Sequence, residues 1–139
     1  LFFGCTTPAV KTVENSKCRE EIYQLQAKEN KGLVASPEAG LRMDEVGAEI
    51  EKQRGPIRDC YVNANSTPTP KERREIRFVF LIRKDGSVGR ACVDKTQFEG
   101  EGLQTCLAQV LHRIQFPIPR DGRAVWISFP FDFVKHTGT

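Results

Sequence analysis

The stretch IRFVFLIRKDGSVGRACVD, residues 76–94, decides the fold. Its first half alternates in the manner of a β-strand, yet apolar side chains occupy both faces in the middle. Such a strand is buried on both sides, so residues 76–83 are predicted to be central in a sheet. Lys84-Asp85-Gly86-Ser87 is typical of a hairpin turn, and residues 88–94 are predicted to return as a shorter, less apolar strand.

The flanking segments complete the predicted order of elements. Residues 101–115 carry apolar residues at helical spacing and end near Phe116-Pro117, whereas 124–134 alternates again and predicts a third strand. Upstream, 43–50 begins a helical stripe that Gly55-Pro56 breaks or kinks, after which Pro56 can serve as a first-turn residue of a helix that carries the apolar residues of 57–64. Residues 15–30 predict an N-terminal helix with a thin apolar face, made of Cys18, Ile22, Leu25 and Glu29.

Composition bounds the class of protein. A chain of 139 residues is long enough for one domain. Its net charge is only +3, with charges of both signs mixed along the chain, and does not indicate a particular class of binding partner. The densest basic stretch, residues 71–77, is interrupted by Glu72 and Glu75 and lacks interleaved aromatic residues, so nucleic-acid binding is not favoured. No apolar run approaches the roughly 18 residues that cross a bilayer.

The first eight residues, LFFGCTTP, resemble the end of a bacterial lipoprotein signal, in which a small residue precedes a cysteine that is acylated after cleavage. Cys5 is then the lipidation site, and we expect further residues before Leu1 and removal of residues 1–4. Residues 1–14 are accordingly interpreted as a lipobox remnant and tether. The alternative is a chance Gly-Cys pair near an apolar terminus.

Apart from Cys5 the chain has four cysteines, Cys18, Cys60, Cys92 and Cys106. Four cysteines allow three different sets of disulfide pairs. Disulfides in an oxidising periplasm explain this number better than buried free thiols do. Their spacing includes no Cys-x-x-Cys, and His112 and His136 are distant, so no metal site and no cofactor are predicted. Neither histidine nor the Glu99 and Glu101 pair suggests catalysis, and the protein is predicted not to be an enzyme.

Four segments, IRDCYVNA (57–64), RFVFLIRKDGSV (77–88), CLAQVLHRIQFPIP (106–119) and WISFPFDF (126–133), resemble successive landmarks of the AgmX/PglI C-terminal domain. That family is related to the TonB C-terminal domain of bacterial cell envelopes. The resemblance covers residues 40–135 and implies an α+β fold, in which a three-stranded antiparallel sheet packs against two helices. Residues 15–39 would add the N-terminal helix and a loop, and 136–139 a tail.

The predicted packing pairs the cysteines. Cys60 and Cys106 lie on the apolar faces of the two helices that should share one side of the sheet, so they can form one disulfide. Cys18 and Cys92 would then fix the N-terminal helix over the other face. The alternative pairings bond Cys60 to Cys18 or to Cys92.

The third strand is predicted to be an edge, because residues 76–83 lie between it and residues 88–94. Pro130 agrees, since a strand proline must direct its missing donor away from the ladder. Trp126, Ser128, Pro130 and Asp132 would then turn their backbone nitrogens outward, where a partner's strand can pair. For Trp126 two positions remain open, a binding anchor or a place beneath the N-terminal helix, of which we favour the second.

These features predict a lipoprotein anchored in the outer membrane on its periplasmic side, without a small-molecule substrate. It would bind other envelope proteins through its edge strand, in an assembly for motility or transport. The alternative is a periplasmic or secreted enzyme inhibitor or glycan-binding domain.

Lipidation at Cys5 is testable in a full-length precursor. We expect a membrane-associated product that begins at Cys5, because several acyl chains on this residue would give lasting anchorage. Cys5→Ser removes the residue that is acylated, so it should leave the precursor unprocessed or soluble. Intact-mass spectrometry and membrane fractionation measure both outcomes. Residues 1–4 retained in the native host would contradict the assignment.

Overall fold

The computed structural model describes residues 11–12, 16–33, 40–64, 73–98 and 101–134. The proposed lipidation site Cys5, the tail 136–139, His136 and Glu99 lie outside these residues. The helices are α1 (Ser16–Glu29), α2 (Met43–Glu51), α3 (Arg54–Asn63) and α4 (Gly102–Arg113). The strands are β1 (Lys11–Thr12), β2 (Arg73–Ile82), β3 (Val88–Thr96) and β4 (Val125–Val134).

The sheet has the order β1-β3-β2-β4, and every described pairing is antiparallel. As predicted, β2 is central between the two other long strands. The two-residue β1 was not predicted: Lys11 and Thr12 pair with the end of β3, so this part of the expected tether belongs to the sheet. The fold class is α+β, with three long antiparallel strands and one short additional strand.

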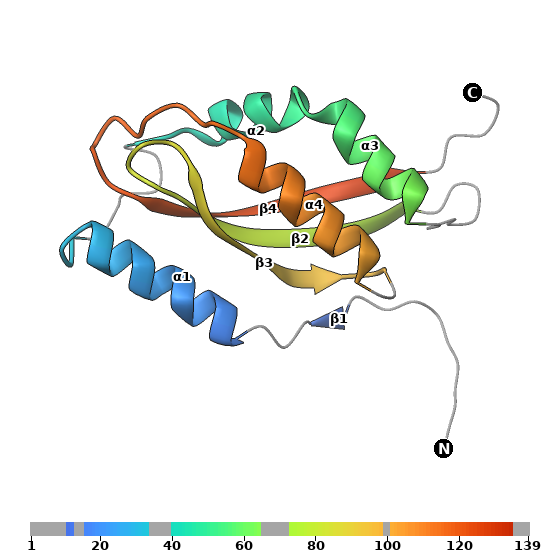
Figure 1. The fold of residues 1–139 in the computed structure, drawn as a ribbon, viewed down its shortest axis with the longest axis horizontal. Helices are drawn as coiled ribbons and strands as arrows, with labels where there is room; N and C mark the ends of the chain where they lie inside the picture. Colours follow the sequence, from blue (N-terminus) through green and yellow to red (C-terminus); the bar gives the residue numbers. More distant parts are fainter. Residues whose placement is uncertain (1–10, 13–15, 34–39, 65–72, 99–100, 135–139) are drawn as a thin grey trace, which may run out of the picture.

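Helices cover both faces of the sheet, with α2, α3 and α4 on one side and α1 on the other (Figure 1). The larger core lies under the three helices, where Phe78 and Phe80 of β2 are almost fully buried with residues from α2, α3 and α4. The break or kink expected at Gly55-Pro56 is a break, and it lies earlier in the chain: Lys52 and Gln53 form a turn between α2 and α3, and Gly55 lies inside α3. Pro56 lies in the first turn of α3, as predicted.

The opposite face has a much smaller core. It consists of Cys18, Ile22, Val79, Leu81, Cys92 and Ala124. Leu25 was expected on the buried face of α1, but its side chain is 40% exposed. Successive helical residues turn by about 100°, so three residues turn by about 300°, which places Leu25 about 60° around the helix axis from Ile22. Asn30 is buried instead, and its amide side chain bonds both the backbone N–H and the carbonyl of Ala124.

Both predicted disulfides are present. Cys60 and Cys106 join α3 to α4 with Cα atoms 5.6 Å apart, and Cys18 and Cys92 join α1 to β3 at 6.1 Å. The first bond links two helices that also share apolar contacts. The second attaches a helix whose buried apolar residues are only Cys18 and Ile22.

Removing either disulfide should lower the free energy of unfolding by roughly 4 kcal/mol, since each closes a long loop. The structural effects should differ: Cys18→Ala/Cys92→Ala should expose the α1 amides to hydrogen exchange, whereas Cys60→Ala/Cys106→Ala should leave them protected. Denaturant unfolding and hydrogen-exchange mass spectrometry make the comparison. Equal protection of α1 in both variants would contradict the role assigned to Cys18–Cys92.

A second tertiary link connects α2 to the segment between α4 and β4. The Arg120 guanidinium donates to both carboxylate oxygens of Glu45, and one of its nitrogens also donates to the Gly40 carbonyl at 3.2 Å. The hydrogen bond from Arg120, followed by the one from the Arg42 backbone N–H, lowers the pKa of Glu45 to about 2. The carboxylate form of Glu45 therefore stabilises the folded state.

The lowered pKa of Glu45 predicts a pH dependence of stability. Its contribution is complete above about pH 4.5 and is lost as the pH falls towards 2, because the unfolded chain binds the proton first. Glu45→Gln should lower stability at neutral pH and lose less stability than the parent on acidification from pH 5 to 2. Urea titrations across this range measure it, and parallel pH profiles for the two proteins would refute the assignment.

Candidate functional site

The candidate site is the outer edge of β4. This strand pairs with β2 from Arg73↔Val134 to Ile82↔Val125 without a register shift. Among the described residues no strand pairs with its other side, as the sheet order indicates. The prediction that the third strand is an edge is confirmed.

The uninterrupted register fixes the direction of the backbone groups along the edge. Pro130 is opposite Arg77, and it has no N–H to give to β2. Backbone direction alternates along a strand, so Trp126, Ser128 and Asp132 share the outward direction of the Pro130 nitrogen. The edge therefore offers outward amides on both sides of one proline gap.

These four residues also share the face of the sheet that α1 covers in part. Their partners on β2 include Leu81 opposite Trp126 and Val79 opposite Ser128, both members of the smaller core. Trp126 and Asp132 are exposed, whereas Ser128 and Pro130 are half-buried. The structure thus gathers all the predicted edge residues into one row on one face.

An aromatic pair marks one end of this row. The rings of Trp126 and of Tyr23, on α1, lie edge to face with centroids 5.9 Å apart. Trp126 is 40% exposed and Tyr23 42%. Trp126 therefore lies against the flank of the N-terminal helix, where both rings remain accessible, rather than beneath it. Sequence reasoning missed Tyr23, because it lies off the apolar face of α1.

The other end of the row is polar. Arg77 forms an ion pair with Glu75 at 3.2 Å and donates a long hydrogen bond of 3.5 Å to the Ser128 hydroxyl. Glu75 is directly opposite the exposed Asp132. The carboxylates of Glu75 and Asp132 thus face each other across the strands with only the Arg77 guanidinium nearby. This excess of negative charge favours the binding of a positively charged group of a partner. The edge changes from aromatic to acidic along its length.

The opposite face of β4 presents further aromatic side chains. Phe129 and Phe133 are half-buried, and Phe133 stacks on Tyr61 of α3 with ring centroids 4.7 Å apart. Phe129 also packs against the buried Phe131 at 5.3 Å. A strand added at this edge would therefore meet apolar surface on the face covered by α3.

Residues considered for catalysis are not assembled into a site in the described part of the chain. His112 is exposed on α4, and Glu101 is exposed beside the start of that helix. Within the described ranges no group of three or more His, Cys, Asp and Glu residues could hold a metal ion. None of the helices described is long and apolar enough to span a membrane.

Comparisons of the chain with protein-family models, with curated proteins and with solved structures found no match. The resemblance to the AgmX/PglI C-terminal domain therefore stays a prediction. The geometry of the β4 edge and of the surfaces beside it is what bears on function.

Proposed function

We propose that the chain is a non-enzymatic envelope lipoprotein whose α+β domain binds other envelope proteins by accepting a strand at β4. The observation that carries this proposal is the edge of β4, which no other described strand covers, with Pro130 in uninterrupted register among outward-facing positions. Strand addition obtains affinity from main-chain hydrogen bonds and specificity from alternate side chains. The β4 edge offers both.

The proline gap limits the length of the added strand. Pro130 removes one donor, so the best continuous pairing runs along Trp126 and Ser128, and Asp132 lies beyond the gap. An alternating partner segment would place an apolar side chain near Trp126 and Tyr23. A basic side chain further along would meet the carboxylates of Asp132 and Glu75.

The location and family remain part of the same proposal. The lipobox-like sequence around Cys5 supports an anchor in the outer membrane, and the four sequence landmarks together with the α+β fold support a TonB-C-like domain. A periplasmic position suits two disulfides. A role in motility or transport follows from the family resemblance alone.

Glycan binding is the second candidate, and the exposed Tyr23–Trp126 pair favours it. An aromatic face can pack against the apolar C–H face of a sugar ring while the hydroxyl or indole N–H stays in contact with water. This mode needs the rings and not the backbone of β4. The two candidates therefore differ in which substitution abolishes binding.

Substitutions at neighbouring positions of β4 separate the candidates. Ile127→Pro should lower the free energy of unfolding by roughly 1 to 3 kcal/mol, because it removes a ladder donor and leaves a buried acceptor on β2 without its partner. Ser128→Pro should stay near the parent in thermal melts and lose capture of envelope proteins, whereas the matched control Ser128→Ala keeps the outward amide and should retain capture. Equal stability of the two proline variants would refute the edge register.

Trp126→Ala completes the test. If the domain binds glycans, Trp126→Ala should abolish binding to purified peptidoglycan while Ser128→Pro binds as the parent does. If it binds by strand addition, Ser128→Pro should be the more damaging change. Envelope-protein capture that is unaffected by Ser128→Pro would overturn the proposed function.

A further inference from the structure

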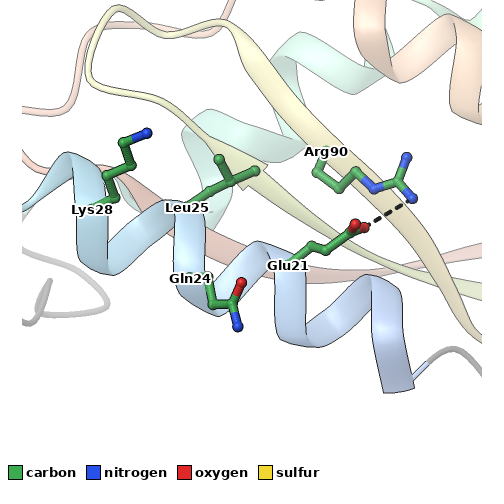
Figure 2. A pocket seen from close by; sticks show the side chains of 5 residues that line it. All are labelled: Glu21, Gln24, Leu25, Lys28 and Arg90. Atoms are coloured by element: carbon green, nitrogen blue, oxygen red, sulfur yellow. Dashed lines mark ion pairs between the residues drawn. The ribbon is translucent and has the colours of Figure 1, made fainter.

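A groove runs along the other flank of α1, between this helix and the β2–β3 hairpin. Figure 2 shows its larger hollow, of about 550 Å³, which is lined by Glu21, Gln24, Leu25, Lys28 and Arg90. A second hollow of about 370 Å³ adjoins it, lined by Leu25, Lys28, Glu29, Lys31, Arg83 and Lys84. Because the two hollows share Leu25 and Lys28, they form one continuous surface, the basic groove.

Ion pairs hold the walls of the basic groove together. Glu21 on α1 pairs with Arg90 on β3 at 3.2 Å, as drawn in Figure 2. Glu29, the last residue of α1, pairs with Arg83 at 3.1 Å and accepts a hydrogen bond from the Lys84 backbone N–H at 2.8 Å. Both acidic residues of the groove therefore already have cationic partners.

The remaining charges of the groove are positive. In the part of the chain that the structure describes, Lys28, Lys31 and Lys84 have no carboxylate within ion-pair distance. Leu25 lies among them, and its side chain is 40% exposed. An apolar side chain surrounded by unpaired ammonium groups fits an anionic ligand that also carries an apolar group.

We infer that the basic groove binds a short, extended acidic segment of a partner protein, with one apolar side chain against Leu25. From Glu21 to Glu29, the last residue of α1, the groove follows about 12 Å of helix at 1.5 Å per residue, and Lys31 lies just beyond in the turn after the helix. An extended segment of about five residues covers that distance. Acidic side chains on either side of the apolar one would reach the ammonium groups on both walls.

The composition of the groove favours a peptide over an anionic lipid surface. Leu25 is the only large apolar side chain among the residues that line the two hollows, whereas attachment to a lipid surface strengthens with the apolar area that is buried. The groove is also separate from the β4 edge, since Tyr23 contacts Trp126 on the opposite flank of α1. The inference therefore stands apart from strand addition and can fail independently of it.

The full chain can be titrated with a fluorescein-labelled peptide, Asp-Glu-Leu-Asp-Glu, in a fluorescence anisotropy assay at low ionic strength. We expect saturable binding that weakens as salt is added. The peptide Asp-Glu-Ser-Asp-Glu should bind several-fold more weakly, because it lacks the apolar contact. Binding that does not saturate, or that is the same for both peptides, would overturn the inference.

Charge reversal locates the site. Lys28→Glu on one wall and Lys84→Glu on the other should each weaken binding about five- to tenfold, because an attraction becomes a repulsion. Lys17→Glu is the matched control: it makes the same charge change at an exposed position of α1 outside the groove, and it should bind within about twofold of the parent. Thermal melts verify that each variant is folded.

Two outcomes would contradict the assignment. Equal weakening by Lys17→Glu and Lys28→Glu would mean that net charge alone attracts the peptide. Binding to vesicles of anionic phospholipid that depends on Lys28 and Lys84, without binding of the peptide, would assign the surface to a membrane instead.

Discussion

The constraint on which this structure depends is that β2 is apolar on both faces. Phe78 and Phe80 are buried on one side, and Val79 and Leu81 on the other. Each such side chain contributes about 1.5 to 3 kcal/mol when it is fully buried, so neither face can be left to water. The chain therefore needs two covering layers, and α1 has to supply the second.

That second layer is attached by few apolar contacts and by several specific ones. Apart from Cys18 and Ile22, α1 buries little, and the Cys18–Cys92 disulfide holds one end. At the other end Asn30 satisfies both backbone groups of Ala124, just before β4 begins. A helix held at its two ends along a narrow line leaves both flanks exposed. The Tyr23–Trp126 pair and the basic groove are those flanks.

Sequence reasoning succeeded where one strong pattern decided the outcome. The period of two in β2 and β4, together with Pro130, was enough to predict the central strand, the edge and the row of outward positions. The apolar faces of two helices, combined with the packing that the family resemblance implies, paired Cys60 with Cys106. It failed where a tertiary contact decided. A buried Asn30 carries no hydrophobic signal, a two-residue β1 has no period, and the exposure of Leu25 follows from how α1 is rotated on the sheet. Tyr23 and the basic groove were missed for the same reason.

The proposed surfaces thus differ in what maintains them. The backbone edge of β4 depends directly on its pairing with β2, whose other face packs into the main core, and depends on α1 only through the cover that this helix gives to Val79 and Leu81. The aromatic end of the edge and the basic groove both require α1 in place, because Tyr23, Leu25 and Lys28 all project from it. Side-chain recognition therefore depends strongly on the contacts that hold α1, the Cys18–Cys92 bond among them, whereas main-chain recognition depends on them less. A partner that uses both the backbone edge of β4 and the side chains of α1 would bind tightly and selectively only to the oxidised protein. The reduced protein would keep the backbone edge but would discriminate little among partner strands.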